Sequence, residues 1–354
     1  MEFAVAVATS TESWRVVERA EALGFEAAWF YDTQLLNPDV FIGMALAAAK
    51  TERIRLGTGV LIPSNRIEPV TANALATLNK LAPGRIDFGV GTGFTGRRTM
   101  GLKAIPLARM KTYVERVQRM LLGETIEWDF EGHSRTIGFL NADFGLINVE
   151  DPVALHISAM GPKARRLTAE MNAGWLNFGA QVESATRDLA DMRSAWREAG
   201  RDDADLRATL FFLGCVLGDG EAADSERAMA QAGPWVSVTF HNLVETTEAN
   251  SMARVLPENV NAALEKYRGI YSGYTPAHAR YLNNHRGHLM FLREEERGLL
   301  DADMIRSLSM TGTRAELVDR LRQLRDAGYT QFAVQVVEGQ EAALDDWADV
   351  FAAL

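Results

Sequence analysis

One unit recurs along the chain: a helical pattern ends at a glycine, and a short apolar run follows it. The copies cover residues 17–30, 167–179 and 318–336, with a looser one at 196–214. The glycines that close the helical patterns are Gly24, Gly174, Gly200 and Gly328. Glycine adopts the left-handed conformation that ends a helix, after which the chain can turn into a strand. The runs are apolar at nearly every position, which is typical of parallel strands covered on both faces.

Extending this interpretation predicts eight strands, near residues 3–8, 27–31, 54–58, 86–90, 153–158, 175–178, 210–216 and 332–336. Helices are predicted near residues 12–23, 40–50, 68–81, 107–122, 163–172, 183–199, 221–231 and 341–353. Two helix starts carry a capping box, Thr9 with Glu12 and Thr313 with Glu316, and Pro162 suits a first helical turn. Eight such pairs are typical of a (β/α)8 TIM barrel of roughly 250 residues. Periodicity does not report closure, so an open, doubly wound sheet is the alternative.

The 354 residues exceed such a barrel by about 100, and the surplus lies in two insertions. Residues 124–149, after the fourth helix, alternate in polarity around glycine-containing turns, which indicates a β-hairpin. Residues 233–312, after the seventh strand, contain aromatic residues, histidines and further helical stretches. We expect both insertions to form lids and walls of a pocket. Because no linker is visible, residues 1–354 are expected to form a single domain.

Composition excludes several classes of protein. The chain has 47 acidic and 37 basic side chains, a formal charge of -10, so we expect no nucleic-acid partner and no anionic membrane partner. Its one cysteine, Cys215, excludes an internal disulfide and lies in an apolar run typical of a buried residue. No run reaches the roughly 18 apolar residues of a membrane span, and no basic leader precedes an apolar stretch. We therefore expect a soluble, cytoplasmic protein that acts on a small molecule.

The densest glycine cluster covers residues 89–101, after the fourth predicted strand. It contains the dinucleotide fingerprint G-x-G-x-x-G, but no acidic residue follows at the expected spacing and the next long helix begins late. We interpret the segment as a loop that approaches a flat or phosphorylated ligand closely, with a tight turn as the alternative. Arg97 and Arg98 either add anion-binding capacity or are solvated loop residues.

Two other strand ends carry candidate ligand groups. In residues 156–167 a Gly-Pro step precedes a basic helix start, where backbone N–H groups suit a phosphate; the basic residues that follow are alternatively a solvated helix face. Asp32 directly follows the second strand. It is either a hydrogen-bond acceptor for a ligand or a turn residue.

The histidines near the end of the second insertion are candidate metal ligands. His285 and His288 are three residues apart, with His278 upstream and His241 further away. Such a pair can bind zinc on a helix, but no cysteine and no close carboxylate completes a four-ligand set, and Gly287 weakens the helix. We therefore predict no metal site, and expect pocket-lining or structural histidines. The motifs of serine hydrolases, zincins and P-loop proteins are absent from the sequence.

Several segments in order along the chain together resemble the bacterial-luciferase-like superfamily of flavin- and deazaflavin-dependent oxidoreductases. They are EALGFEAAWFYD, RIRLGTGVLIPSNRIEPVTANALATL, LAPGRIDFGVGTG, ISAMGPKARRL, AGWLNF and MTGTRAELVDRLRQLRDAGYTQFAVQ. The sequence GVGTG after the fourth strand is similar to the branch that uses coenzyme F420, which includes methylenetetrahydromethanopterin reductase. The resemblance implies a TIM barrel with the cofactor ring across the carboxyl ends of the strands.

The resemblance also implies the cofactor-binding residues. In relatives, the position of Gly59-Val60 carries a non-proline cis peptide that backs the ring. The other matching residues are Asp32, Thr92, Gly93, Ala159, Met160, Gly161 and Asn177. The cofactor is expected to be coenzyme F420, with FMN as the alternative, and relatives lead us to expect a homodimer.

Two departures from the family bear on the substrate. F420-dependent sugar-phosphate dehydrogenases have histidine where this chain has Thr33, and glutamate where it has Phe94. Without that acid–base pair, we expect hydride transfer between F420 and a small electron-poor molecule, with Arg97 stabilising developing negative charge. Thr33, Tyr31 and His288 are the candidate proton donors. The alternatives are an FMN-dependent monooxygenase, a non-catalytic flavin-binding relative and a TIM-barrel isomerase unrelated to flavins.

Overall fold

The computed structural model describes residues 1–245 and 257–354, and it confirms the closed barrel. The barrel strands are β1 (Glu2–Val7), β2 (Ala27–Phe30), β3 (Arg55–Thr58), β4 (Ile86–Val90), β7 (Ala154–Ser158), β8 (Gly174–Phe178), β9 (Ala208–Phe212) and β12 (Gln331–Val336). All neighbours are parallel, in the order β1-β12-β9-β8-β7-β4-β3-β2. The barrel closes through β1, where Val5 pairs with Val334 on one side and with Ala28 on the other.

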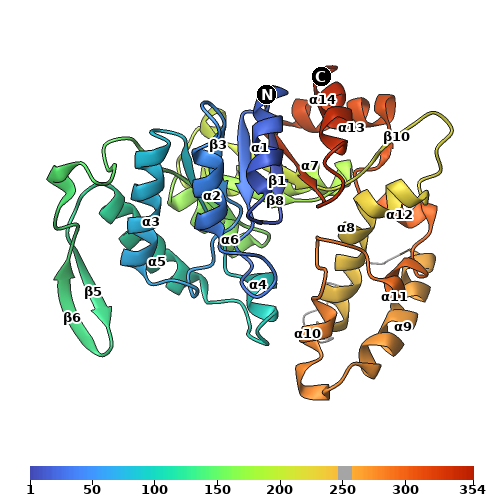
Figure 1. Ribbon diagram of the computed structural model, residues 1–354, viewed down its shortest axis with the longest axis horizontal. Coiled ribbons are helices and arrows are strands. Elements are labelled where there is room, and N and C mark those ends of the chain that lie inside the picture. Colours follow the sequence, from blue (N-terminus) through green and yellow to red (C-terminus); the bar gives the residue numbers. More distant parts are fainter. Residues whose placement is uncertain (246–256) are drawn as a thin grey trace.

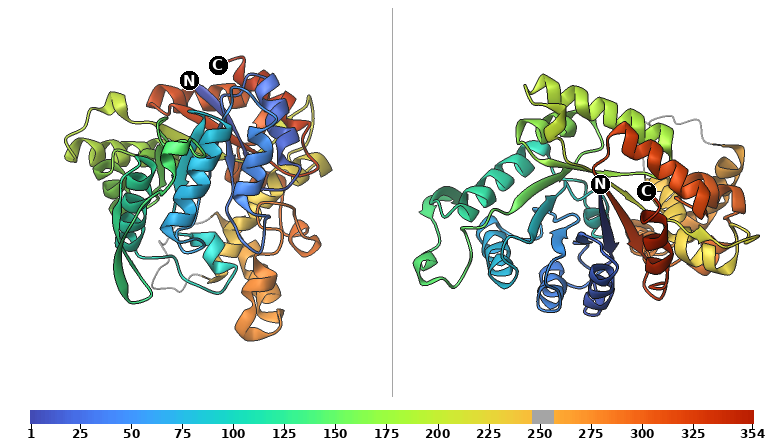
Figure 2. Two further views of the ribbon diagram at one scale, coloured as in Figure 1. Left: turned by 60° about the vertical axis from the view of Figure 1, so that its left-hand side comes forward. Right: turned by 90° about the horizontal axis from the view of Figure 1, so that it is seen from above.

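Helices surround the barrel, as Figure 2 shows from above. They are α1 (Ser13–Ala22), α2 (Val40–Ala48), α3 (Glu68–Leu81), α4 (Phe94–Arg98), α5 (Leu107–Leu121), α6 (Pro162–Glu170), α7 (Val182–Glu198), α13 (Arg314–Ala327) and α14 (Ala343–Phe351). Alternate strand residues face in and out. Ala4 and Ala6 point into the barrel, while Val5 and Val7 pack under the helices. Small inward residues leave room in the barrel for the large ring of Trp29.

Both predicted insertions are present. The hairpin of β5 (Ile126–Phe130) and β6 (His133–Ile137) follows α5 and projects from one side of the molecule (Figure 1). The second insertion consists of α8 (Glu226–Glu245), α9 (Glu258–Gly273), α10 (Tyr281–Asn284), α11 (Glu294–Arg297) and α12 (Ala302–Leu308). We call residues 226–308 the helical insertion; part of the predicted span, residues 246–256, lies outside the described residues. The helical insertion has its own apolar core, which includes Phe240, Val260, Leu264 and Ile305.

The structure corrects two predicted elements around the seventh strand. The strand predicted over 210–216 ends at Phe212, and a short β10 (Val216–Leu217) pairs instead with β11 (Gly312–Thr313). The helix predicted over 221–231 is the first part of α8, so the insertion starts earlier than predicted. The helix that packs on the barrel here is α13, and its predicted capping box between Thr313 and Glu316 is confirmed.

Two local predictions are wrong. Thr9 makes no capping box: its hydroxyl donates to the carbonyl of Tyr31, and α1 begins without a side-chain cap. Gly174 does not close a helix, since it lies within β8 and Asn172 takes the left-handed conformation with a φ of 53°. A Cβ at Gly174 would lie 2.3 Å from a ring nitrogen of His156, so close packing against that ring requires the glycine.

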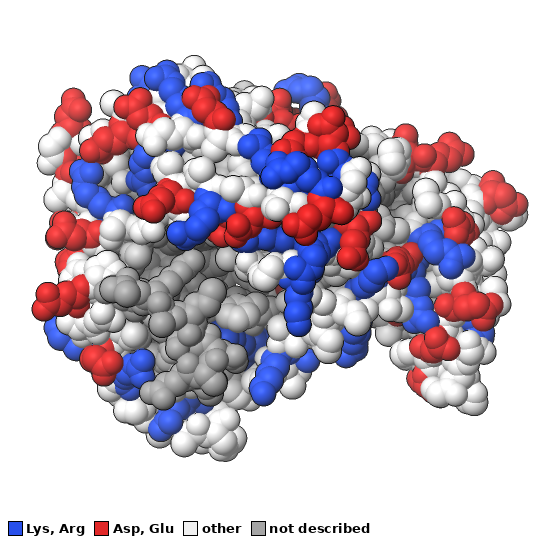
Figure 3. Space-filling view, turned by 180° about the vertical axis from the view of Figure 1, so that it is seen from behind, with Lys and Arg blue, Asp and Glu red and all other residues white. Residues whose placement is uncertain are grey.

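Acidic and basic side chains are interspersed over the face shown in Figure 3. Cys215 is buried, as expected, and burial raises the pKa of its thiol to about 12. Among the described residues, no helix is both long enough and apolar enough to cross a membrane.

Candidate active site

The loops that follow β2, β3, β4 and β7 meet at the carboxyl end of the barrel, because these strands are consecutive neighbours. This is the end at which TIM-barrel enzymes place their active sites. Figure 1 shows α4 at this end of the molecule, on the same side as α8 and α10. Most predicted site residues are brought together here: Asp32, Thr33, Gly59, Val60, Thr92, Gly93, Arg97, Ala159, Met160 and Gly161.

Asp32 is buried, and its carboxylate organises the loop that follows β3. Nη1 of Arg66 lies 3.0 Å from both carboxylate oxygens, and the backbone N–H of Ile62 donates to one of them at 3.1 Å. Nδ2 of Asn65 lies 3.3 Å from the same oxygen. Burial alone would lower the pKa of Arg66, but the charges of Asp32 and Asp39 outweigh burial and raise it. Asp32 therefore fixes the shape of the loop beside the barrel mouth.

An apolar floor lies at the barrel mouth. The peptide bond between Gly59 and Val60 is cis, as the resemblance implied. Val60, Phe178 and Leu289 are partly buried there and pack on the interior layer of the barrel. The ring of Phe178 stacks on that of Phe211, with the centroids 4.7 Å apart. Such a surface suits one face of a planar aromatic ligand.

Packing within the protein accounts for the glycines in the last part of β4 and in the loop that follows it. A Cβ on Gly89 would lie 2.0 Å from the carbonyl oxygen of Thr58, and one on Gly91 would lie 2.7 Å from Cγ2 of Val60. Gly93 has a φ of 79° and begins α4. These glycines let the loop after β4 press against the loop after β3. The tight-turn alternative therefore explains the cluster without a ligand.

The start of α6 has the features of a phosphate site. Gly161 is its N-cap residue, no side chain caps the helix, and a Cβ there would meet nothing within 4 Å. Pro162 occupies the first helical position, as predicted, and Lys163 beside it is exposed. Arg165 is turned away and pairs with two aspartates of α7. Open space, free backbone N–H groups and one lysine fit the phosphate tail of a nucleotide-like cofactor.

The two arginines of α4 are placed differently. The guanidinium of Arg98 lies 3.8 Å from the ring centre of Phe94, and its Nη1 donates to Oδ1 of Asn242 at 3.2 Å. Arg98 therefore connects α4 to α8. Arg97 donates through Nε to the carbonyl oxygen of Lys103 at 2.5 Å, and it pairs with no carboxylate in the part of the chain that the structure describes.

A turn of the helical insertion covers part of the barrel mouth. The carbonyl oxygen of Leu289 accepts a hydrogen bond from Nε2 of Gln335 at 2.6 Å. The hydroxyl of Tyr31 donates to Oε1 of the same glutamine at 3.0 Å, and burial raises the pKa of this phenol. His288 is buried next to this turn, with its Nδ1 3.1 Å from Nδ1 of His241. The structure thus gives His288 a protein partner.

Asn177 does not join the predicted site. It is fully buried, and its neighbours along β8, Leu176 and Phe178, are the residues that face into the barrel. Nδ2 of Asn177 donates to the hydroxyl of Tyr329 at 2.8 Å, and that hydroxyl donates to the carbonyl of Ala185 in α7. Strand alternation therefore places Asn177 between the barrel and its outer helices.

Two residues that hold the site's side chains in place, Arg66 and Glu296, were not among the predicted site residues. Arg66 had a usable signal, since it follows the third strand by a short loop. Glu296 had none, because its partner His241 lies 55 residues away in the sequence.

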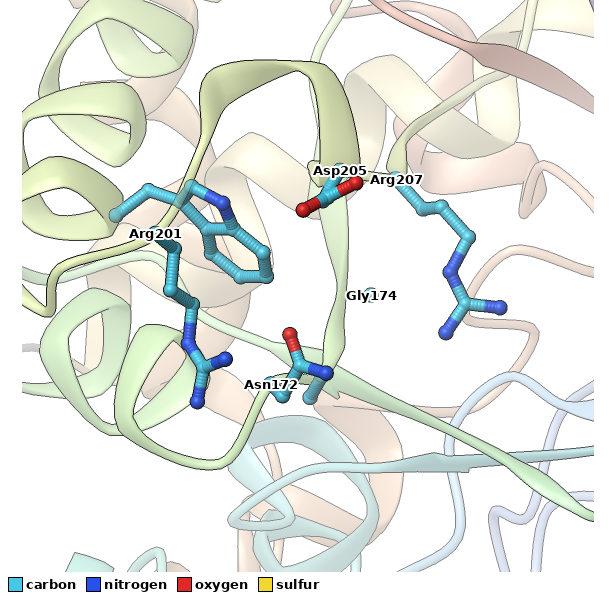
Figure 4. Close-up of a pocket in the computed structure, with 7 residues that line it drawn as sticks. Asn172, Gly174, Arg201, Asp205 and Arg207 are labelled. Carbon is cyan, nitrogen blue, oxygen red and sulfur yellow. The ribbon is translucent and has the colours of Figure 1, made fainter.

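A separate hollow of about 360 Å³ lies at the opposite end of the barrel, where β8 and β9 begin. Figure 4 shows Arg201 and Arg207 on its two sides, with Asp205 near the top. It is far from the loops that carry the predicted site residues, so we place the active site at the carboxyl end.

The structure is a closed (β/α)8 barrel with an apolar surface at its mouth that suits a planar ligand. Residues 6–331 match the model of the luciferase-like monooxygenase family. The chain belongs to this family.

Known proteins agree with that assignment. The chain is 25% identical over 323 residues to a 5,10-methylenetetrahydromethanopterin reductase of Archaeoglobus fulgidus. The alignment covers 89% of this chain and 86% of the relative. The solved structure of a coenzyme F420-dependent tetrahydromethanopterin reductase from Methanopyrus kandleri matches 98% of this chain and 97% of its own, with a TM-score of 0.73 and 20% identity. The structure of the oxygenating component of a Baeyer-Villiger monooxygenase from Pseudomonas putida, in complex with FMN, matches 100% of this chain and 96% of its own. The TM-score is 0.63 and the sequence identity is 11%.

Proposed function

We propose that the protein is an oxidoreductase that transfers a hydride between coenzyme F420 and a small, electron-poor organic molecule. The observation that carries this proposal is the similarity to the Archaeoglobus fulgidus reductase, which extends over most of both chains. The apolar floor and the open start of α6 are consistent with it, because one suits the ring and the other suits the phosphate.

The chain's own residues bind and orient the reactants. Val60 and Phe178 would support the ring from below, and Lys163 with the backbone of α6 would hold the phosphate. When bound, F420 supplies the hydride-carrying ring carbon. The walls of the site must keep the acceptor atom within about 3–3.5 Å of that carbon.

Charge and proton handling are assigned to residues that follow β4 and β2. Arg97, which pairs with no described carboxylate, would stabilise negative charge that develops on the acceptor. Thr33 is half-buried beside Asp32 and remains our candidate proton donor. His288 is a weaker candidate, because His241 engages its ring. The absence of an acid–base pair at Thr33 and Phe94 favours reduction of an acceptor over oxidation of an alcohol.

Titration of the cofactor-free protein with F420 and, separately, with FMN tests the proposal. We expect F420 to bind at micromolar concentration or tighter and FMN to bind at least tenfold more weakly. Reduced F420 is then offered nitroaromatics, enones and imines, and its reoxidation is followed by absorbance.

Each contrary outcome identifies an alternative. Preference for FMN with oxygen consumption would favour a monooxygenase, and tight F420 binding with no turnover across the panel would favour a non-catalytic binding protein. Binding of neither cofactor would overturn the proposal. We further propose that the protein is a cytoplasmic homodimer that binds no nucleic acid; light scattering of the purified protein tests the dimer.

A further inference from the structure

Three buried histidines of the helical insertion face one another. His241 lies near the end of α8, His285 directly follows α10, and His288 lies in the turn beyond it. One ring nitrogen of each lies within 4.8 Å of those of the other two. We call these three residues the histidine cluster.

Two glutamates orient the rings: Glu296 is fully buried and Glu245 is partly buried. Nε2 of His241 is hydrogen-bonded to Oε1 of Glu296, and Nε2 of His285 lies 3.0 Å from Oε2 of Glu245. A carboxylate on Nε2 holds the proton there and leaves the lone pair of Nδ1 directed away from it. In both rings, therefore, the nitrogen that remains for another partner is Nδ1.

Hydrogen bonding within the cluster does not satisfy all of these nitrogens. Nδ1 of His241 lies 3.1 Å from Nδ1 of His288, so one proton can serve that pair. Nδ1 of His285 is buried and has no hydrogen-bond partner among the described residues 1–245 and 257–354, and the residue is only 2% exposed. A buried polar atom without a partner is unfavourable by about 1–3 kcal/mol, so its presence beside two other ring nitrogens points to a ligand that all three share.

We propose that the histidine cluster binds a divalent transition-metal ion, with zinc the best match to its donors. Neutral imidazoles are good ligands for zinc, and carboxylates on their outer nitrogens are the usual second layer. Two nitrogens bound to one tetrahedral zinc at about 2.0–2.1 Å lie about 3.3–3.4 Å apart, close to the spacing of His241 and His288. A ring nitrogen of His285 lies within 4.8 Å of the other two, so a small shift of this ring completes the set.

The surrounding charges define the rest of the site. Among the described residues, the cations near the cluster are Arg98, whose Nε lies 4.0 Å from Glu245, and Arg293, which pairs with Glu296. The negative charge of each glutamate balances the positive charge of one arginine. The protein therefore leaves the positive charge of a bound ion without compensation. We therefore expect a hydroxide or another small anion as the fourth ligand. The ion would join α8 to the turn that carries Leu289 over the barrel mouth.

Metal content of the purified full-length protein tests this inference without any cofactor or substrate. After dialysis against zinc and then against metal-free buffer, we expect about one zinc per chain by mass spectrometry. Titration with Co²⁺ alone should give the visible absorption of a four-coordinate ion. His285→Ala should weaken Zn²⁺ binding at least 100-fold, and Glu296→Gln about 10- to 100-fold.

His278→Ala is the matched control, because His278 belongs to the same insertion and is exposed. It should bind zinc like the parent protein. Equal zinc binding by His285→Ala, or no zinc and no cobalt spectrum in the parent protein, would overturn the inference. Should His285→Ala fail to fold, the cobalt titration of the parent protein decides alone. Since F420 binding is measured separately, failure of the metal site and failure of the proposed function are distinguishable.

Discussion

Nη1 of Arg66 is equidistant, at 3.0 Å, from the two carboxylate oxygens of Asp32, and both side chains are largely shielded from solvent. The same guanidinium reaches Asp39 through Nη2 at 2.6 Å, but Asp39 is partly exposed. Arg66 thus joins a buried carboxylate at the barrel mouth to an exposed one at the start of α2.

Asp32→Asn is expected to lower the free energy of unfolding by about 3 kcal/mol, because it leaves a shielded guanidinium without its main partner. Asp39→Asn is the matched control. Asparagine caps helices as well as aspartate does. The exposed ion pair of Asp39 with Arg66 contributes under about 1 kcal/mol to the free energy of unfolding. Urea unfolding of both variants measures the difference. Equal losses in the free energy of unfolding would show that burial does not make the ion pair of Asp32 with Arg66 more stabilising than the exposed pair with Asp39.

Arg97→Ala is expected to lower kcat by about 100-fold with the reactive compound of the panel, because one charged donor to the transition state is lost. The dissociation constant for F420 should stay within about twofold, since in our proposal Arg97 acts on the acceptor and not on the cofactor. Arg135→Ala, an exposed change on β6, serves as the control for overall charge. An unchanged kcat would remove Arg97 from the mechanism.

Lys163→Ala is expected to weaken F420 binding by about tenfold, because it removes a cation from the start of α6, where the phosphate would bind. The loss should shrink as salt is raised from low to physiological ionic strength, since salt screens an exposed charge. Lys80→Ala, on the last turn of α3, is the control. Fluorescence titration at several salt concentrations measures both. Identical affinities for the two variants would contradict a phosphate site at α6.

The pH dependence of stability can be tested at Glu221, which precedes α8. A hydrogen bond from Arg227 lowers the pKa of Glu221 to about 2, and the backbone N–H of Gly218 adds to the effect. Because the folded pKa is below the unfolded one, the stabilisation is complete above about pH 4.5 and is lost as the pH falls toward 2.

Glu221→Gln should therefore be less stable than the parent protein by about 1 kcal/mol at pH 7, a value reduced for solvent screening, and nearly equal to it near pH 2. Urea unfolding at a series of pH values measures the gap. Glu226→Gln, an exposed change in the first turn of α8, should show a gap under about 0.5 kcal/mol throughout. A Glu221→Gln gap that does not depend on pH would refute this assignment.

The barrel was predictable because every strand is a short apolar run and most are followed by a clear helical pattern. Local signals failed where packing decides the conformation. Gly174 looks like a helix end, yet the ring of His156 requires its glycine, and Asn172 makes the turn instead. Asn177 lies on the outer face of β8 because side chains alternate along a strand. A strand that is apolar at nearly every position does not show in its sequence which residues face outward.

The site residues, like the fold, were predictable where local sequence signals decide and not where packing decides. Residues directly after strand ends were brought together as expected, because parallel strands end at the same edge of a barrel. The sequence singled out His241, His285 and His288 but predicted no metal site, because spacing along the chain does not show which residues fold onto one another. The structure brings Glu296 to His241 and Glu245 to His285, and the sequence pattern pointed to neither glutamate.

Glu245 interacts with two parts of the protein at once. One oxygen lies 3.0 Å from His285, and the carboxylate lies 4.0 Å from Arg98 of α4. Displacing α4 changes the electrostatic field at the imidazole of His285, and displacing that imidazole changes the field at α4. The rim of the barrel and the buried interior of the insertion are therefore energetically coupled, and a perturbation introduced at either one is transmitted to the other.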